Sequence, residues 1–139
     1  MPTASLTRRV SFSAAHRYRR PDWSDEKNAA TFGACSLPNY HGHNYVCDVT
    51  VSGPISGETG FLIDLAELDR VLAAEVTSRF DHKNINLEVP EFADGKMIPS
   101  GENLARFIFE KVQQRLSGTA KVTRVTVGED TTLSSTYES

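Results

Sequence analysis

Two histidines separated by one glycine, His41 and His43, form the pattern in this sequence that is best suited to metal chemistry. In an extended strand, residues i and i+2 point to the same side, so both imidazoles can converge on one ion. His16 follows an earlier predicted strand, and pairing of the two strands would supply a third ring nitrogen. Three histidines with one open position are typical of a catalytic zinc site. A chance H-x-H beside a surface histidine fits the same residues, because short motifs also match by accident.

Two further groups are candidates for proton transfer. Asp81 directly precedes His82, the fourth histidine, and a neighbouring carboxylate can orient or charge-stabilise an imidazole. Cys35 lies in a loop six residues before His41, where a thiol beside a dication would be a candidate base or nucleophile. Cys35 could equally be a small buried residue, or a fourth ligand that closes the site. Cys47 shares the parity of the apolar residues of its strand, which predicts core packing.

Glu129 continues the alternation of a predicted strand, with the same parity as Thr123, Val125 and Val127. On a buried face, an ionised carboxylate is costly unless it is paired. A ligand with two adjacent N–H donors, such as the edge of a pterin, would compensate it. A glutamate that turns to solvent at the end of the strand fits the pattern as well.

Hydrophobic periodicity predicts the elements that must position these residues. Alternating apolar residues predict four strands, over residues 6–14, 45–52, 122–127 and 133–137. Apolar residues at helical spacing predict one helix from an N-cap at Asp64 to Phe80, and a second from Ser100 to a stop at Gly118.

The segment between the first two strands, residues 17–38, has no such periodicity and is interpreted as a long irregular loop, which is often functional. The order of the elements predicts a single α+β domain over residues 1–139. In this domain, two helices cover one face of an antiparallel four-stranded sheet.

The bulk composition narrows the classes of function. The 139 residues carry 15 Lys and Arg against 18 Asp and Glu, a formal net charge of -3, so nucleic acid and anionic membranes are not expected as partners. No apolar stretch approaches the roughly 20 residues of a membrane-spanning helix, and the first residues lack the apolar core of a signal peptide. Two cysteines make no disulfide framework. We therefore expect a cytoplasmic protein, and the open edges of a small sheet predict an oligomer.

Taken together, these motifs resemble the 6-pyruvoyl-tetrahydropterin synthase family, which includes the 6-carboxytetrahydropterin synthases of queuosine biosynthesis. The resemblance runs from about Phe12 to Thr131 and rests on six pieces in the order of the family. They are Phe12-Ser13-Ala14-Ala15-His16, Cys35 with five residues before His41-Gly42-His43-Asn44-Tyr45, Gly60-Phe61-Leu62-Ile63-Asp64-Leu65, Asp81-His82-Lys83-Asn84-Ile85-Asn86, Pro99-Ser100-Gly101-Glu102-Asn103-Leu104 and Val125-Thr126-Val127-Gly128-Glu129.

The resemblance implies a tunnelling fold (T-fold), in which the sheets of several subunits join into a β-barrel and commonly form a homohexamer, a dimer of trimers. In the family the pieces of the site meet across subunit boundaries. For single residues it implies zinc on His16, His41 and His43, catalysis by Cys35 with the proton-relay pair Asp81 and His82, and pterin binding by Glu129 and Glu102.

The function implied is that of a zinc-dependent lyase that converts 7,8-dihydroneopterin triphosphate to 6-pyruvoyl-tetrahydropterin and releases triphosphate. The five-residue gap between Cys35 and His41 resembles the pyruvoyl-forming branch, because the carboxy-forming branch typically has three. A 6-carboxytetrahydropterin synthase acting on the same substrate and a non-catalytic zinc- or pterin-binding module are the alternatives. Arg17, Arg19 and Arg20 are candidates to neutralise the triphosphate.

The sequence departs from the family pattern in two places. Asp130 stands between Glu129 and Thr131, where the family usually has threonine directly after the anchoring glutamate. The Pro-Thr-x-Glu pattern of the family appears as Pro99-Ser100-Gly101-Glu102. Both departures concern the pterin contacts, and neither affects the metal ligands or the cysteine.

Overall fold

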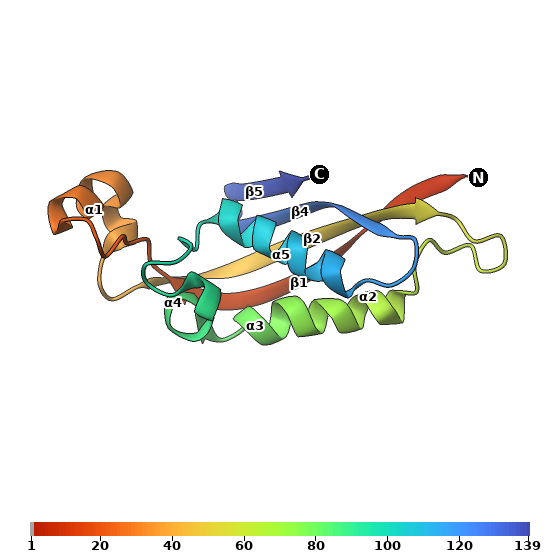
Figure 1. The fold of residues 1–139 in the computed structure, drawn as a ribbon, viewed down its shortest axis with the longest axis horizontal. Coiled ribbons are helices and arrows are strands. Elements are labelled where there is room, and N and C mark those ends of the chain that lie inside the picture. The colour runs from red at the N-terminus through yellow and green to blue at the C-terminus, as the bar shows by residue number, and fades with distance from the viewer. Residues whose placement is uncertain (1) are drawn as a thin grey trace.

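The computed structural model describes residues 2–139, which fold into one sheet with helices packed against it (Figure 1). Along the chain the elements are β1 (Thr3–His16), α1 (Asp25–Phe32), η1 (Gly33–Ser36), β2 (His41–Pro54), α2 (Leu65–Leu72), η2 (Ala73–Thr77), α3 (Ser78–Phe80), β3 (Lys83–Asn84), α4 (Ile85–Glu88), η3 (Pro90–Phe92), α5 (Gly101–Arg115), β4 (Lys121–Asp130) and β5 (Leu133–Glu138). Two of the short elements, η1 and η3, are 3-10 turns, and η2 is a π-helical segment.

The sheet has the strand order β3-β1-β2-β4-β5. The four long strands are antiparallel to their neighbours, as predicted, and β1 pairs with β2 along its whole length, from Thr3 opposite Pro54 to His16 opposite His41. The predicted number of strands is wrong by one, because β3 adds a fifth strand parallel to the end of β1. With two residues, β3 is too short for any periodicity to reveal it.

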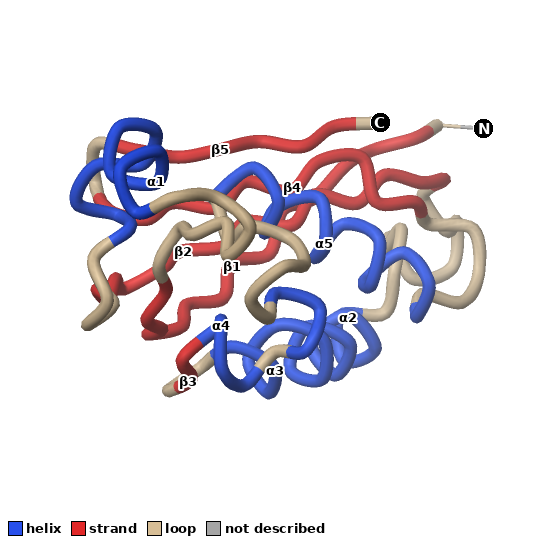
Figure 2. The backbone as a smooth tube through the Cα atoms, turned by 60° about the vertical axis from the view of Figure 1, so that its left-hand side comes forward, coloured by secondary structure: helices blue, strands red, loops and turns tan. Residues whose placement is uncertain are grey.

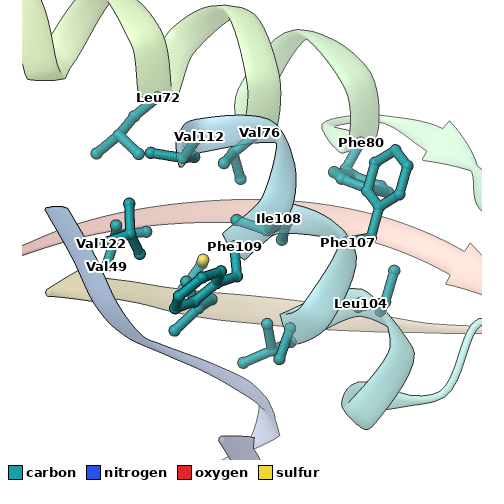
Figure 3. Packing of buried hydrophobic residues seen from close by; sticks show 14 of the residues in the cluster. Val49, Leu72, Val76, Phe80, Leu104, Phe107, Ile108, Phe109, Val112 and Val122 are labelled. Atoms are coloured by element: carbon teal, nitrogen blue, oxygen red, sulfur yellow. The ribbon is translucent and has the colours of Figure 1, made fainter. Parts of the chain in front are cut away.

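The helices cover one face of this sheet, and the hydrophobic core lies between the two layers (Figures 1 and 2). On the sheet side, Tyr45, Cys47 and Val49 alternate along β2 and are fully buried, which confirms the core position predicted for Cys47. On the helix side, Figure 3 shows Leu72 and Val76 pointing toward side chains of α5.

Both predicted helix starts are confirmed by their caps. The Asp64 carboxylate accepts a hydrogen bond from the backbone N–H of Ala66 at 3.0 Å, and the Ser100 hydroxyl accepts one from Asn103 at 3.2 Å. Such bonds satisfy N–H groups that have no partner inside the first turn.

The segment 17–38 differs from the irregular loop that was predicted, because it contains α1 and η1. Ser24 caps α1, and the first turn of this helix carries Asp25 and Glu26. Asn28 is its only buried residue, so the helix has no apolar stripe that periodicity could detect. Figure 1 shows α1 at the end of the molecule opposite the N-terminus.

The backbone departs from the predicted pattern in one helix and in one strand. The helix predicted up to Phe80 is interrupted by η2, where the side chain of Glu75 is buried. The pairing of β4 with β2 shifts register: Arg124 lies opposite Thr50, and Val122 lies opposite the next residue, Val51. Val122 therefore faces the core in place of Thr123. A bulge of this kind inserts one residue and reverses the parity of those before it.

Within residues 2–139, none of the helices combines the length and the apolar character that crossing a membrane requires.

Candidate metal site and adjoining pocket

The pairing of β1 with β2 gathers three histidines at one end of the sheet. His16 lies directly opposite His41, and Ala14 lies opposite His43, so all three imidazoles share one face. The ring centroids are 4.6 Å apart for His16 and His41, 5.2 Å for His16 and His43, and 5.1 Å for His41 and His43. One nitrogen of each ring lies within 4.8 Å of the others, so the group can hold a metal ion. The convergence that was predicted from the sequence is therefore present.

The surroundings of His16 suit a metal ligand. Its ring is fully buried, and Nδ1 lies 2.8 Å from the carbonyl oxygen of Pro99. A carbonyl can only accept, so Nδ1 carries the proton and Nε2 keeps a lone pair for a metal. The Tyr45 hydroxyl lies 3.3 Å from that Nε2 and 3.1 Å from Nδ1.

The charge state of the group also suits a metal. Burial lowers the pKa of His16 to about 4; the Pro99 hydrogen bond opposes this shift, and the neighbouring His41 and His43 add to it. Burial, together with His43, also lowers the pKa of His41. Neutral imidazoles are the form that binds metal, so these two rings need not lose a proton first at neutral pH.

Cys35 lies in η1 and is half-buried. Its carbonyl oxygen accepts a hydrogen bond of 2.7 Å from the backbone N–H of Tyr18, which joins the loop to the chain just after His16. Cys35 is not a member of the three-histidine group. Among the described residues, the group that could hold a metal ion therefore consists of the three histidine side chains.

Asp81 and His82 form the predicted pair. His82 Nδ1 lies 3.1 Å from Asp81 Oδ2, and Asp81 Oδ1 accepts a hydrogen bond of 2.9 Å from the backbone N–H of Ser13. That backbone bond is the largest cause of a lowered pKa at Asp81. The His82 side chain is 84% exposed, and it lines a hollow of about 390 Å³ together with His43. Cys35 does not line this hollow.

Glu129 points inward, as one of the two sequence interpretations predicted. It is 9% exposed and lies on the face of Val125 and Val127. The Tyr18 hydroxyl donates a hydrogen bond of 3.0 Å to Glu129 Oε1. The pairing of β4 with β5 shifts register between Gly128 and Asp130, so Glu129 is the extra residue of a bulge.

Glu129 and Glu102 line one pocket of about 490 Å³. Its lining residues are Tyr18, Ser100, Glu102, Glu129, Leu133, Ser134, Ser135 and Thr136. Glu102 Oε1 accepts a hydrogen bond of 3.2 Å from the Ser135 hydroxyl. The structure thus brings together the two side chains for which the resemblance implies pterin binding.

The segments that carry the two departures from the family pattern make close local contacts. A Cβ at Gly101 would lie 2.6 Å from Ser135 Oγ and 3.2 Å from Ser135 Cβ, so the start of α5 can approach β5 this closely because residue 101 has no side chain. Asp130 caps the turn that follows β4, because its Oδ1 accepts hydrogen bonds of 2.7 Å from both the backbone and the side chain of Thr132.

The sequence analysis missed one residue of this site, Tyr18. No motif marks it, and its partner Glu129 is 111 positions away. The three arginines proposed for the triphosphate all lie near carboxylates of the same chain, with N–O distances of 3.8 Å from Arg17 to Asp94, 2.8 Å from Arg19 to Asp25 and 3.4 Å from Arg20 to Asp22.

The molecule is an α+β sheet with its helices on one face. It has a three-histidine group at one end that can hold a metal ion, and a pocket lined by two carboxylates. These features define a protein of the T-fold class. A family model described as 6-pyruvoyl tetrahydropterin synthase matches residues 5–139. The chain belongs to this 6-pyruvoyl tetrahydropterin synthase family.

Individual relatives agree with this assignment. The 6-pyruvoyl tetrahydrobiopterin synthase of Pongo abelii is 43% identical over 113 residues, which is 81% of this chain and 77% of that protein. The protein of the same name from Homo sapiens is 42% identical over 113 residues, which is again 81% of this chain and 77% of that protein. The structure of Caenorhabditis elegans 6-pyruvoyl tetrahydropterin synthase superposes with a TM-score of 0.92 at 34% identity, and the match covers 100% of this chain and 97% of that chain. The predicted fold class is thereby confirmed.

Proposed function

We propose that this chain is a zinc-dependent lyase that converts 7,8-dihydroneopterin triphosphate to 6-pyruvoyl-tetrahydropterin and releases triphosphate. The observation that carries the proposal is the group formed by His16, His41 and His43, which has three side-chain donors and lies in a chain of this family. These three histidines would hold the zinc, because three neutral imidazoles with an open position suit this ion.

The side chains of the site have separate roles in this proposal. Zinc supplies Lewis-acid chemistry that acidifies C–H and O–H bonds of the substrate side chain. Cys35, as thiolate, removes a proton from that side chain, and His82, oriented by Asp81, returns protons elsewhere. Glu129 and Glu102 hold the pterin by its N–H edge.

The overall reaction balances without an external oxidant or reductant. The C–O bond to triphosphate breaks, and the carbon that carried it becomes a methyl group. The two side-chain alcohols become ketones, and the ring takes up two hydrogens to become a tetrahydropterin. One change from alcohol to ketone accompanies the loss of triphosphate, and the other supplies the two hydrogens of the ring.

We further propose that this single domain, residues 1–139, acts in the cytoplasm as a homohexamer built from two trimers, whose sheets join into barrels. Two open sheet edges support assembly. One is the part of β1 that precedes its short pairing with β3, and the other is the outer side of β5. The exposed side of the Asp81–His82 pair suggests that it completes a site with Cys35 of another copy.

Conversion of 7,8-dihydroneopterin triphosphate by the purified zinc-loaded protein, followed by mass analysis of the products, tests this function. We expect 6-pyruvoyl-tetrahydropterin and triphosphate in equal amounts. The Cys35→Ala protein should lose this conversion, whereas Cys47→Ala, a matched control in the core, should keep it. A 6-carboxytetrahydropterin product would replace the proposed product by the alternative one, and unchanged substrate would refute the synthase activity.

A further inference from the structure

Tyr18 connects three parts of the candidate site that are far apart in the sequence. Its ring lies edge-on to His16, with ring centroids 4.9 Å apart, and to His41 at 6.4 Å. Its backbone N–H donates to the carbonyl oxygen of Cys35 at 2.7 Å, and its hydroxyl donates to Glu129 Oε1 at 3.0 Å. The side chain and backbone of one residue therefore contact the histidine group, the thiol loop and the inward carboxylate.

Of the residues that Tyr18 contacts, Glu129 is the one that lines the pocket beside it, where a ligand could bind. Among the described residues, Tyr18 is the one donor to this carboxylate, and it engages a single oxygen, Oε1. Glu129 and Tyr18 both line the pocket of about 490 Å³. A carboxylate at a strand bulge can rotate about its terminal bond, which is broad in its preferred angles. The bond from Tyr18 restricts this rotation and leaves Oε2, together with the second lone pair of Oε1, for other donors.

We propose that Tyr18 is a positioning residue for pterin binding: its hydroxyl holds Oε1 of Glu129 so that the plane of the carboxylate presents both oxygens to the N–H edge of the ligand. This inference rests on the proposed function only for the identity of the ligand. Since two N–H donors on one ring edge need a carboxylate in a fixed plane, the orientation of Glu129 sets the strength of the bidentate contact. Tyr18 acts through Glu129 and touches no reacting atom in this arrangement.

The Tyr18→Phe substitution isolates this role. Phenylalanine keeps the ring beside His16 and His41, and it keeps the backbone N–H that binds Cys35, so only the hydroxyl is lost. The bond between Tyr18 and Glu129 exists with and without ligand, so its loss lowers affinity only through the freedom that the Glu129 side chain regains, about a 2- to 10-fold change. We expect the dissociation constant for neopterin, a fluorescent pterin without phosphates, to rise by about this factor. The KM for 7,8-dihydroneopterin triphosphate should rise similarly at nearly unchanged kcat.

Two comparisons separate positioning from a general structural effect. Tyr137→Phe removes a phenol hydroxyl from β5, where Tyr137 packs against Phe109, and should leave neopterin binding unchanged. Glu129→Asp retracts the carboxylate by one methylene and breaks the contact from the other side. In that background, Tyr18→Phe should have little further effect, because the two residues act through one bond.

The outcomes are distinct. Wild-type affinity of Tyr18→Phe for neopterin would overturn the inference, and so would an additive loss when the substitution is combined with Glu129→Asp. A fall in kcat at constant KM would also overturn it, because Tyr18 would then act in a chemical step. Absence of turnover by the wild-type protein would overturn the proposed function alone, since neopterin binding still tests Tyr18.

Discussion

His16 provides a measurable link between burial and stability. Its pKa is lowered from 6.5 to about 4, first by burial. Each pH unit of difference between the folded and unfolded pKa is worth about 1.36 kcal/mol, so this difference corresponds to about 3 kcal/mol. Between pH 6.5 and 4, His16 is protonated in the unfolded chain but not in the folded chain. The free energy of unfolding therefore falls as pH falls through this window.

The assay is urea unfolding of the zinc-free protein at one protein concentration between pH 5 and 7. Carboxylates also titrate at low pH, so the informative quantity is the difference from His16→Asn, which keeps a donor for the Pro99 carbonyl and does not titrate. This difference should shrink by about 2 kcal/mol between pH 6.5 and pH 5. A difference that stays constant to within about 0.5 kcal/mol would refute the argument, because His16 would then have an ordinary pKa despite its burial.

Other perturbations have expected outcomes as well. Cys35→Ala should lower kcat by about 10²- to 10⁴-fold at unchanged zinc content, as measured by product formation and metal analysis, and a normal rate would contradict its role as base. Glu75→Gln should lower the free energy of urea unfolding by about 1–3 kcal/mol, because the buried carboxylate accepts hydrogen bonds of 2.7 Å from Arg79 and Arg115. Glu110→Gln, which breaks one exposed ion pair, should change it by less than about 1 kcal/mol. Chelation should abolish activity and lower Tm, and zinc but not magnesium should restore both; full activity after verified metal removal would contradict a catalytic zinc.

Local patterns determined much of the candidate site. Strand parity placed His41 and His43 on one side, because side chains alternate along any extended chain. Parity likewise assigned Cys47 to the core, and the polar residues Asp64 and Ser100 marked the helix starts. These features depend on a few neighbouring residues, so they can be read without knowing where the rest of the chain lies.

Irregular backbone segments could not be predicted from such local patterns. The bulge at Thr123 reversed the parity of the first residues of β4, and the π-helical segment interrupted the helix that leads to Phe80. The helix α1 escaped detection because it lies at one end of the molecule with few buried side chains. None of these features produces a regular apolar period in the sequence.

By itself, then, the sequence determined which residue types face the same way along each strand or helix, and so which of them could act together. Only the tertiary structure decided that His16 lies opposite His41, that Glu129 sits at a bulge facing a pocket, and that Tyr18 reaches this carboxylate across 111 positions. The physical reason is that register and long-range approach depend on the packing of the whole sheet against its helices, whereas alternation and capping depend on adjacent residues alone.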